Sequence, residues 1–209
     1  MNATKKDGLA IAKRISDNKY NFIDANGKLL FNEWFNSLGF FSEGFARVER
    51  SDGLMNFIGE DGKLLSKQWF YWAENFENGF ARVKREDKLL NLINKQGKLL
   101  SDTWFDWISG FYDGFSVVGR ENHEYNYIDK QGKIISEEWF KWLDYFHNGF
   151  ARVQRFDNSM NFIGEDGKII SDEWFRYADY FDEYELAVVE RTNGELCKID
   201  KNGKIVVRK

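Results

Sequence analysis

The chain has 209 residues, with 18% aromatic and 31% charged residues and a net charge of −4 at pH 7. This mixture supplies both a large core and a charged surface, which excludes an intrinsically disordered chain. The acidic balance argues against a nucleic-acid binder, because such proteins usually carry a basic excess.

A tandem repeat runs through almost the whole sequence. An asparagine, a large apolar residue and an isoleucine precede a Gly-Lys pair, and successive glycines lie 35 residues apart (97 − 62, for example). These glycines are Gly27, Gly62, Gly97, Gly132 and Gly167, with Gly203 following after 36 residues. A fixed period of this length predicts stacked structural repeats. We therefore expect one domain, 1–209, built from units of about 8–43, 44–78, 79–113, 114–148 and 149–184 and a partial unit, 185–209.

The copy from 44 to 78 illustrates the elements expected in each unit. Residues 44–50 alternate apolar and charged side chains, which predicts a strand with one buried face. Met55–Ile58 forms a second short strand, Asp61-Gly62 suits a tight hairpin turn, and Lys63–Leu65 returns as a third strand. The first strand of the chain falls at Gly8–Arg14, and Cys197–Lys204 belongs to the partial last unit.

The segment from Ser66 to Phe76 has two interpretations. Trp69, Ala73 and Phe76 follow the i, i+4, i+7 spacing of a short helix, whereas the aromatic content favours a fourth strand. An irregular strand or a single helical turn is favoured. The expected fold is all-β, an open solenoid-like array of hairpin or meander repeats, and a closed β-propeller is the alternative.

The motifs of this unit resemble the WG repeat (KWG-type) family of bacterial proteins. Phe41-Ser42-Glu43-Gly44-Phe45-Ala46-Arg47-Val48 followed by Asn56-Phe57-Ile58 and Asp61-Gly62-Lys63 is similar to the family pattern Phe-x-x-Gly-(Leu/Phe)-Ala-x-Val…Trp-Gly-Tyr-Ile-Asp-x-x-Gly-Lys. The Trp-Gly pair is here Tyr20-Asn21, Met55-Asn56, Leu90-Asn91, Tyr125-Asn126 and Met160-Asn161. Asparagine in place of glycine suits a left-handed or bulged backbone. The resemblance implies tandem β-repeats without catalytic residues.

Two aromatic columns recur at the repeat spacing. The first is invariant and predicts core positions: Trp34, Trp69, Trp104, Trp139 and Trp174, each followed by phenylalanine. We expect Trp104→Ala to lower the free energy of unfolding by roughly 3–5 kcal/mol. The second column varies as surface positions do: Ser37, Trp72, Trp107, Trp142 and Tyr177. Its aromatic members, Trp72, Trp107, Trp142 and Tyr177, are the predicted binding residues, although packing between neighbouring units would also explain them.

No constellation of reactive side chains stands out. His123 and His147 occupy different columns, Cys197 replaces a repeat asparagine, and the Asp24 and Asp129 turns lack the ligand spacing of a calcium loop. An arginine column has acidic neighbours and predicts a charge-paired surface: Arg14, Arg50, Arg85, Arg120, Arg155 and Arg191. We therefore expect no catalytic residue, metal or cofactor.

These observations predict a non-catalytic scaffold that binds a protein partner through an extended repeat surface. A carbohydrate-binding aromatic array is the alternative. No run near 18 apolar residues occurs and no hydrophobic segment follows Met1–Lys6, which predicts neither a membrane helix nor a signal peptide. A single cysteine is typical of a reducing compartment. The expected protein is thus a cytoplasmic monomer that binds no nucleic acid and no membrane.

Overall fold

Short antiparallel strands make up the regular structure of the protein. A computed structural model describes residues 8–206, which contain strands and turns and no helical segment. Residues 1–7, with the Met1–Lys6 segment, and 207–209 lie outside the described residues. None of residues 8–206 belongs to a helix long and apolar enough to cross a membrane. The strands fall into two compact units, one reaching Phe105 and one starting at Asp106, and each unit is considered by itself.

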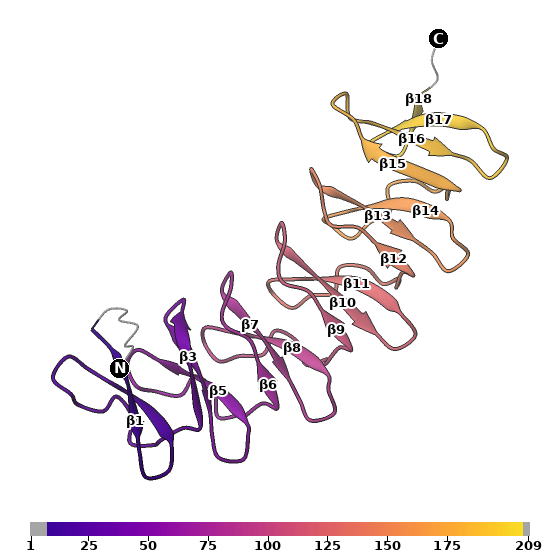
Figure 1. Cartoon of the computed structure of the whole chain (residues 1–209). Helices are drawn as coiled ribbons and strands as arrows, with labels where there is room; N and C mark the ends of the chain where they lie inside the picture. Colours follow the sequence, from indigo (N-terminus) through magenta and orange to yellow (C-terminus); the bar gives the residue numbers. More distant parts are fainter. Residues whose placement is uncertain (1–7, 207–209) are drawn as a thin grey trace. The chain divides into compact units, whose positions relative to one another are not determined.

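The unit that ends at Phe105 contains three sheets. The first sheet pairs β1 (Ala10–Arg14) with β2 (Lys19–Ile23). The second consists of β3 (Ser37–Ser42), β4 (Phe45–Glu49) and β5 (Met55–Gly59). The third consists of β6 (Trp72–Ala73), β7 (Phe80–Lys84) and β8 (Leu90–Asn94). Figure 1 shows the three sheets following one another in chain order.

The unit that starts at Asp106 also contains three sheets. The fourth sheet of the chain consists of β9 (Trp107–Ile108), β10 (Phe115–Arg120) and β11 (Glu124–Asp129). The fifth consists of β12 (Trp142–Leu143), β13 (Phe150–Gln154) and β14 (Met160–Gly164). The sixth consists of β15 (Tyr177–Phe181), β16 (Leu186–Glu190), β17 (Leu196–Asp200) and β18 (Ile205–Val206).

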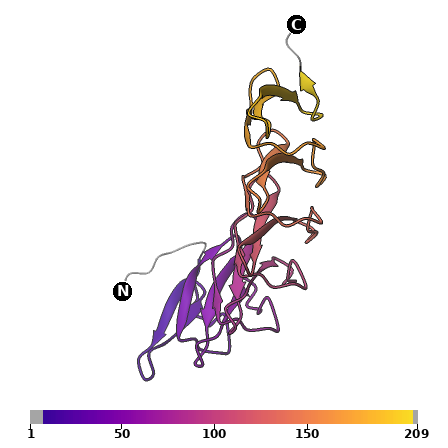
Figure 2. The same cartoon turned by 90° about the vertical axis from the view of Figure 1, so that its right-hand side faces the viewer.

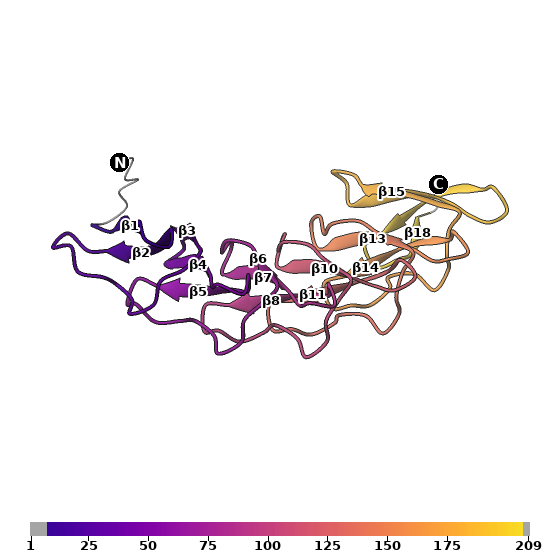
Figure 3. The same cartoon turned by 60° about the horizontal axis from the view of Figure 1, so that its bottom comes forward.

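The predicted all-β tandem array is confirmed. Every described strand pairs only with neighbours in sequence, so no sheet closes into a barrel and none pairs with the sheet of another repeat. Figure 2 shows the sixth sheet, in yellow, beyond the fifth, in orange, and Figure 3 shows β1 and β2 beside the sheet of β3, β4 and β5. The predicted single domain, 1–209, and its unit boundaries stay predictions.

The alternation in the sequence places one face of each central strand in the core. In β7, Ala81 and Val83 are buried while Phe80, Arg82 and Lys84 are half-buried. A strand with period-two alternation presents alternate side chains to opposite faces, so the small Ala and Val face the adjacent sheet. The core of each unit consists of such residues and large phenylalanines such as Phe57 and Phe76.

The third strand of the second to fifth sheets differs from the one predicted, whereas in the sixth sheet the predicted strand after the repeat glycine forms as β18. Lys63–Leu65 contributes only an isolated bridge, Ile58↔Leu64. The segment after Ser66 instead supplies β6, in which Trp72 pairs with Lys84. The helical interpretation is therefore wrong. Because β6 follows β5 in the chain but pairs with β7, a sequence unit counted from residue 44 contributes strands to two successive sheets.

Buried asparagines hold the loop that leads to this strand. Asn91 is fully buried, and its Nδ2 donates to the carbonyl oxygens of Ser101 at 2.8 Å and Thr103 at 3.1 Å. Its Oδ1 accepts a hydrogen bond of 2.8 Å from the Leu92 backbone. The expected left-handed backbone at the asparagine is wrong, since none of these asparagines has a positive φ. The family pattern has glycine at this position, and glycine has no side chain to make these bonds. The asparagine therefore fixes the loop by hydrogen bonds that a glycine could not form.

The repeat glycine is needed for backbone conformation and for close approach between repeats. Gly97 has a φ of +76°, and a Cβ at this position would lie 2.2 Å from the Leu65 carbonyl oxygen of the preceding repeat. Its amide donates to the Asn94 carbonyl at 2.9 Å, which closes the hairpin turn. The turn of one repeat thus packs directly on the backbone of the repeat before it.

We expect Gly97→Ala to destabilise the protein more than Gly79→Ala. Gly79 has a similar φ of +86° and no atom within 4 Å of an added Cβ, so its substitution costs only backbone strain, about 1–2 kcal/mol. Gly97→Ala adds the clash with Leu65, which raises the loss to about 3 kcal/mol or more. Urea unfolding of both variants measures the difference. Equal losses would show that the approach of the two repeats is not tight.

Candidate functional site

The invariant tryptophan column is not the core. Phe105 is 1% exposed, whereas Trp104, the residue before it, is only half-buried. An arginine guanidinium covers the ring of each invariant tryptophan at 3.6 to 4.7 Å from its centroid. The pairs are Arg14–Trp34, Arg50–Trp69, Arg85–Trp104, Arg120–Trp139 and Arg155–Trp174. The tryptophan column therefore forms a stacked outer layer over the core phenylalanines, which corrects the core prediction.

These five arginines and Arg191, the sixth member of the column, are paired with carboxylates, as the sequence predicts. The ion pairs are Arg14–Asp17, Arg50–Asp52, Arg85–Asp87, Arg120–Glu124, Arg155–Glu138 and Arg191–Glu173. Each of these carboxylates neutralises the charge of its guanidinium within the chain, which agrees with the predicted charge-paired surface.

The second aromatic column lies on the surface. Trp107, Trp142 and Tyr177 are 43%, 40% and 45% exposed, and Ser37 is exposed as well. Trp72 differs because Lys84 lies over its ring, with Nζ 5.1 Å from the centroid, and it is half-buried. Of the predicted binding residues, the structure brings Trp107 and Trp142 to one cleft. Trp72 lies in the other unit, and Tyr177 does not line the cleft.

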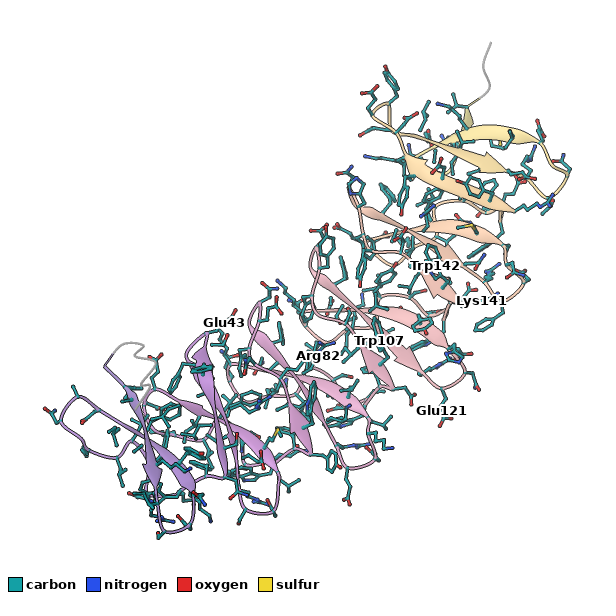
Figure 4. The ribbon with its side chains drawn as sticks, in the orientation of Figure 1. Glu43, Arg82, Trp107, Glu121, Lys141 and Trp142 are labelled. Atoms are coloured by element: carbon teal, nitrogen blue, oxygen red, sulfur yellow. The ribbon has the colours of Figure 1, made fainter. Side chains whose placement is uncertain are left out.

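This cleft, of about 530 Å³, lies between the fourth and fifth sheets. Trp107 comes from β9 and Trp142 from β12, so equivalent strands of successive sheets supply the two indoles (Figure 4). The remaining wall includes Val117, Tyr125 and Tyr145. Aromatic walls with a few polar groups are typical of ligand sites in proteins.

The cleft exists because one repeat departs from the pattern of the others. In two other sheets an arginine of the central strand reaches the next repeat: Arg47 Nη1 donates to Ala73 O at 2.8 Å, and Arg152 Nη1 donates to Ala178 O at 3.2 Å. The equivalent residue of the fourth sheet is Val117, whose side chain has no donor. The cavity occupies the space into which such an arginine would extend.

The partner of the missing arginine is replaced too. Arg82 pairs with Glu74 in the third sheet, but the residue equivalent to Glu74 in the fourth sheet is Ser109. Ser109 Oγ accepts a hydrogen bond of 2.8 Å from the Val117 amide, and Ser116 Oγ donates to Ser109 O at 2.8 Å. The fourth sheet is therefore internally satisfied without the ion pair, and the floor of the cleft becomes apolar.

Asp144 is the carboxylate on the fifth-sheet side of the cleft, and it is held rigidly. Arg152 Nη2 donates to its Oδ2 at 2.8 Å, and the Tyr180 hydroxyl donates to the same oxygen at 2.6 Å. Burial alone would raise the pKa of Asp144, but the hydrogen bonds from Tyr180 and Arg152 outweigh burial and lower it. The same hydrogen bond to Asp144 raises the pKa of Tyr180. Asp144 is thus charged and already neutralised by Arg152.

The reactive residue types do not assemble around the cleft. His123 lines it, but His147 lies outside its lining and Cys197 is in β17, where burial raises the pKa of the thiol. Residues 8–206 contain no group of three or more histidine, cysteine or acidic side chains placed to hold a metal ion.

Several lining residues were not predicted from the sequence. Val117, Gly119 and Asp106 contribute to the cleft because they differ from their counterparts in the other repeats. The invariant tryptophans and the phenylalanines that follow them do not line the cleft. The signal that identifies the cleft is the deviation of one repeat from the shared pattern.

Comparison with protein families identifies the repeat. The model described as "WG containing repeat" matches residues 22–53, 57–88, 92–122 and 127–158, which together are more than half of the chain. No curated protein matches the sequence.

Several solved structures share a distant likeness with the chain. The computationally designed Ika8 protein is 13% identical with a TM-score of 0.35, covering 94% of this chain and 69% of that one. BamB from Moraxella catarrhalis is 12% identical with a TM-score of 0.32, covering 97% and 73%. The WD40 β-propeller domain of Doa1 is 14% identical with a TM-score of 0.31, covering 92% and 74%.

Proposed function

The chain belongs to the WG-containing repeat family, and on that premise we propose that it is a non-catalytic interaction module that binds a protein partner. The observation that carries the proposal is the convergence of Trp107 and Trp142 on the cleft between the fourth and fifth sheets. Both indoles are more than a third exposed, although aromatic side chains of this size are usually covered. Exposed aromatic groups that gather around a cavity mark interaction sites.

The residue types around the cleft suit a polypeptide ligand. Tryptophan and tyrosine are enriched at protein interfaces, because they offer a large contact area and lose little conformational entropy on binding. Tyr145 is 53% exposed at the rim and contacts Tyr112 at 5.4 Å between ring centroids. A cleft of this size accommodates one or two side chains of an extended segment. The proposal requires no catalytic residue, metal or cofactor, and it is compatible with a cytoplasmic monomer.

A carbohydrate ligand is the second candidate, and a specific observation favours it. Trp107 and Trp142 occupy equivalent positions of successive repeats, as rings that stack on successive sugar units would. The apolar floor at Val117 favours the apolar part of a polypeptide side chain, because a sugar hydroxyl would find hydrogen-bonding partners only at other lining residues such as Asp106.

We expect the double variant Trp107→Ala/Trp142→Ala to lose ligand binding while it remains folded. Both side chains are largely on the surface, so the melting temperature should change by only a few degrees. Selection from a randomised peptide library should enrich peptides on the wild-type protein, and the double variant should bind them at least about tenfold more weakly. A glycan array tests the second candidate on the same proteins.

A matched control separates the cleft from the whole aromatic column. Trp72→Ala/Tyr177→Ala removes two members of the same column that do not line the cleft. This control should bind the selected peptides as the wild type does. Binding lost equally in both double variants would indicate an extended ladder instead of the cleft. Glycan binding without peptide enrichment would replace the protein partner by a carbohydrate.

A further inference from the structure

We infer that the cleft receives a cationic side chain, lysine or arginine, of the protein partner, seated on the Trp107 ring beside Asp106. This inference rests on the proposed function, since it specifies the chemistry of the segment that the cleft would bind. Three features of the fourth sheet support it, and each is a departure from the pattern of the other repeats.

The first feature is the absence of an intramolecular lysine over Trp107. In the third sheet Trp72 pairs with Lys84, whose ammonium lies 5.1 Å from the centre of the indole. In the fourth sheet the residue that pairs with Trp107 is Gly119. The protein therefore shows an ammonium group bound at this position of one repeat, and it leaves the same position vacant in the next.

The second feature is the absence of an arginine at the same ring. In the fifth sheet the Arg152 guanidinium lies 5.7 Å from the centre of the Trp142 ring. Its counterpart in the fourth sheet is Val117. Among the described residues, Trp107 makes an edge contact with Tyr125, with centroids 6.2 Å apart, and no cation covers its ring.

The third feature is an additional carboxylate. Asp106 lines the cleft, and its amide donates to the Gly119 carbonyl at 2.9 Å, which places it next to the vacant position. The equivalent residues are Asn36, Tyr71, Lys141 and Arg176, so only the fourth sheet has an acid here. The described residues include no ion-pair partner for the Asp106 carboxylate. An aromatic face beside an unpaired carboxylate is the environment that a cation prefers.

The other charges around the cleft do not oppose this assignment. Arg120 is occupied by Glu124 at 2.5 Å and by the Trp139 ring at 4.1 Å. Asp144 is bonded to Arg152. The remaining lining residue with a basic side chain is His123. Among the described lining residues, the Asp106 carboxylate is therefore the negative charge that has no ion-pair partner.

Matched peptides test the inference. The probes are acetyl-Gly-Leu-Lys-Tyr-Gly-amide and its analogues with arginine, trimethyllysine or norleucine in place of lysine, titrated against tryptophan fluorescence. The three cationic peptides should bind at least about fivefold more tightly than the norleucine peptide, within the range of cation–π contacts. Equal binding of the norleucine peptide would overturn the inference. Tetramethylammonium alone binding as tightly as the peptides would also overturn it, in favour of a small ammonium ligand.

Two pairs of variants locate the cation. Asp106→Asn should weaken binding of the lysine peptide about fivefold or more, whereas Asp102→Asn, at an exposed acid outside the cleft lining, should not. Gly119→Lys supplies a tethered ammonium like Lys84 and should block the lysine peptide. Gly119→Gln is its neutral control, because an added Cβ meets Tyr125 Cε1 at 3.1 Å in both variants. Equal binding by Gly119→Lys and Gly119→Gln would contradict the proposed seat.

The outcomes distinguish the inference from the proposed function. Library peptides enriched on the wild type but free of lysine and arginine would overturn the cationic ligand and leave the protein-binding proposal standing. A library that yields no peptide dependent on Trp107 and Trp142 would overturn both. Circular dichroism melts of every variant ensure that lost binding is not lost folding.

Discussion

Phe105→Ala is expected to lower the free energy of unfolding by about 3–5 kcal/mol, whereas Trp104→Ala should lower it by only about 1–2 kcal/mol. The larger residue has the smaller effect because of where each lies. Phe105 is 1% exposed, and its backbone exchanges two hydrogen bonds with Leu90. Trp104 is half-buried and lies against the core on one side and under the Arg85 guanidinium, at 4.6 Å, on the other.

Denaturant unfolding of the two variants, followed by circular dichroism, compares these neighbours directly. Arg85→Ala is the companion variant, since it removes the cation and leaves the indole in place. It should cost about 1 kcal/mol, and combining it with Trp104→Ala should cost less than the sum of the two. If Trp104→Ala costs as much as Phe105→Ala, the tryptophan column belongs to the core after all.

The repeat period and the alternation of residues were sufficient to predict most strands. β4 and β5 fall within a residue or two of the predicted strands at 44–50 and Met55–Ile58. Strand formation here follows local signals, namely alternating burial and a glycine turn, which a single sequence displays. The hairpin glycine was predicted on backbone grounds, and its close approach to the preceding repeat was not visible in the sequence.

The tryptophan column shows why invariance within a chain does not indicate burial. A half-buried indole stacked under arginine must be repeated as faithfully as a core phenylalanine, because both of its partners are repeated. The sequence contains the relevant signal in the recurring distance between the two columns, which is 19 residues from Arg50 to Trp69 (69 − 50) and in the three pairs after it, and 20 residues from Arg14 to Trp34. Read together, an arginine column and a tryptophan column at a recurring separation predict a stack.

The segment after Ser66 shows a limit of periodicity. Trp69, Ala73 and Phe76 follow helical spacing, but Trp72–Ala73 is a strand. The buried Asn56 donates to the carbonyl oxygens of Ser66 at 2.8 Å and Gln68 at 3.1 Å. These two bonds hold the loop before β6 against Asn56 of β5. The hydrogen bonds from Asn56 join residues 10 and 12 positions apart. The spacing of residues within the segment therefore cannot reveal them.

Trp72, Trp107, Trp142 and Tyr177 were predicted together as binding residues, and of these Trp107 and Trp142 line one cleft. Trp107 and Trp142 share a cleft because Val117 and Gly119 are smaller than their counterparts. A repeat protein gains an asymmetric surface only where one copy departs from the rest. The departures are visible in the sequence, but their convergence in space depends on the strand register, in which Trp107 pairs with Gly119.

Asn126→Asp tests the buried asparagine column with almost no change in shape. Asn126 Nδ2 donates to Ser136 O at 2.8 Å and Glu138 O at 3.0 Å, and its Oδ1 accepts from the Tyr127 amide at 2.8 Å. A carboxylate in this position would direct negative charge at two carbonyl oxygens in a fully buried site. We expect a loss of about 3–5 kcal/mol at pH 7, against nearly none for Asn75→Asp at an exposed position.

The loss caused by Asn126→Asp should depend on pH in a defined direction. Burial and the facing carbonyl oxygens would raise the pKa of the new carboxyl in the folded state above its unfolded value of about 3.9. The folded state then binds the proton more tightly, so the stability deficit relative to wild type is smallest below pH 3.9 and grows as the pH rises to the folded pKa. Unfolding free energies of the variant and the wild type at pH 4 and pH 7 give the two deficits. A deficit that is the same at both values would show that the site admits water, and the asparagine would then hold its loop less tightly than its hydrogen bonds indicate.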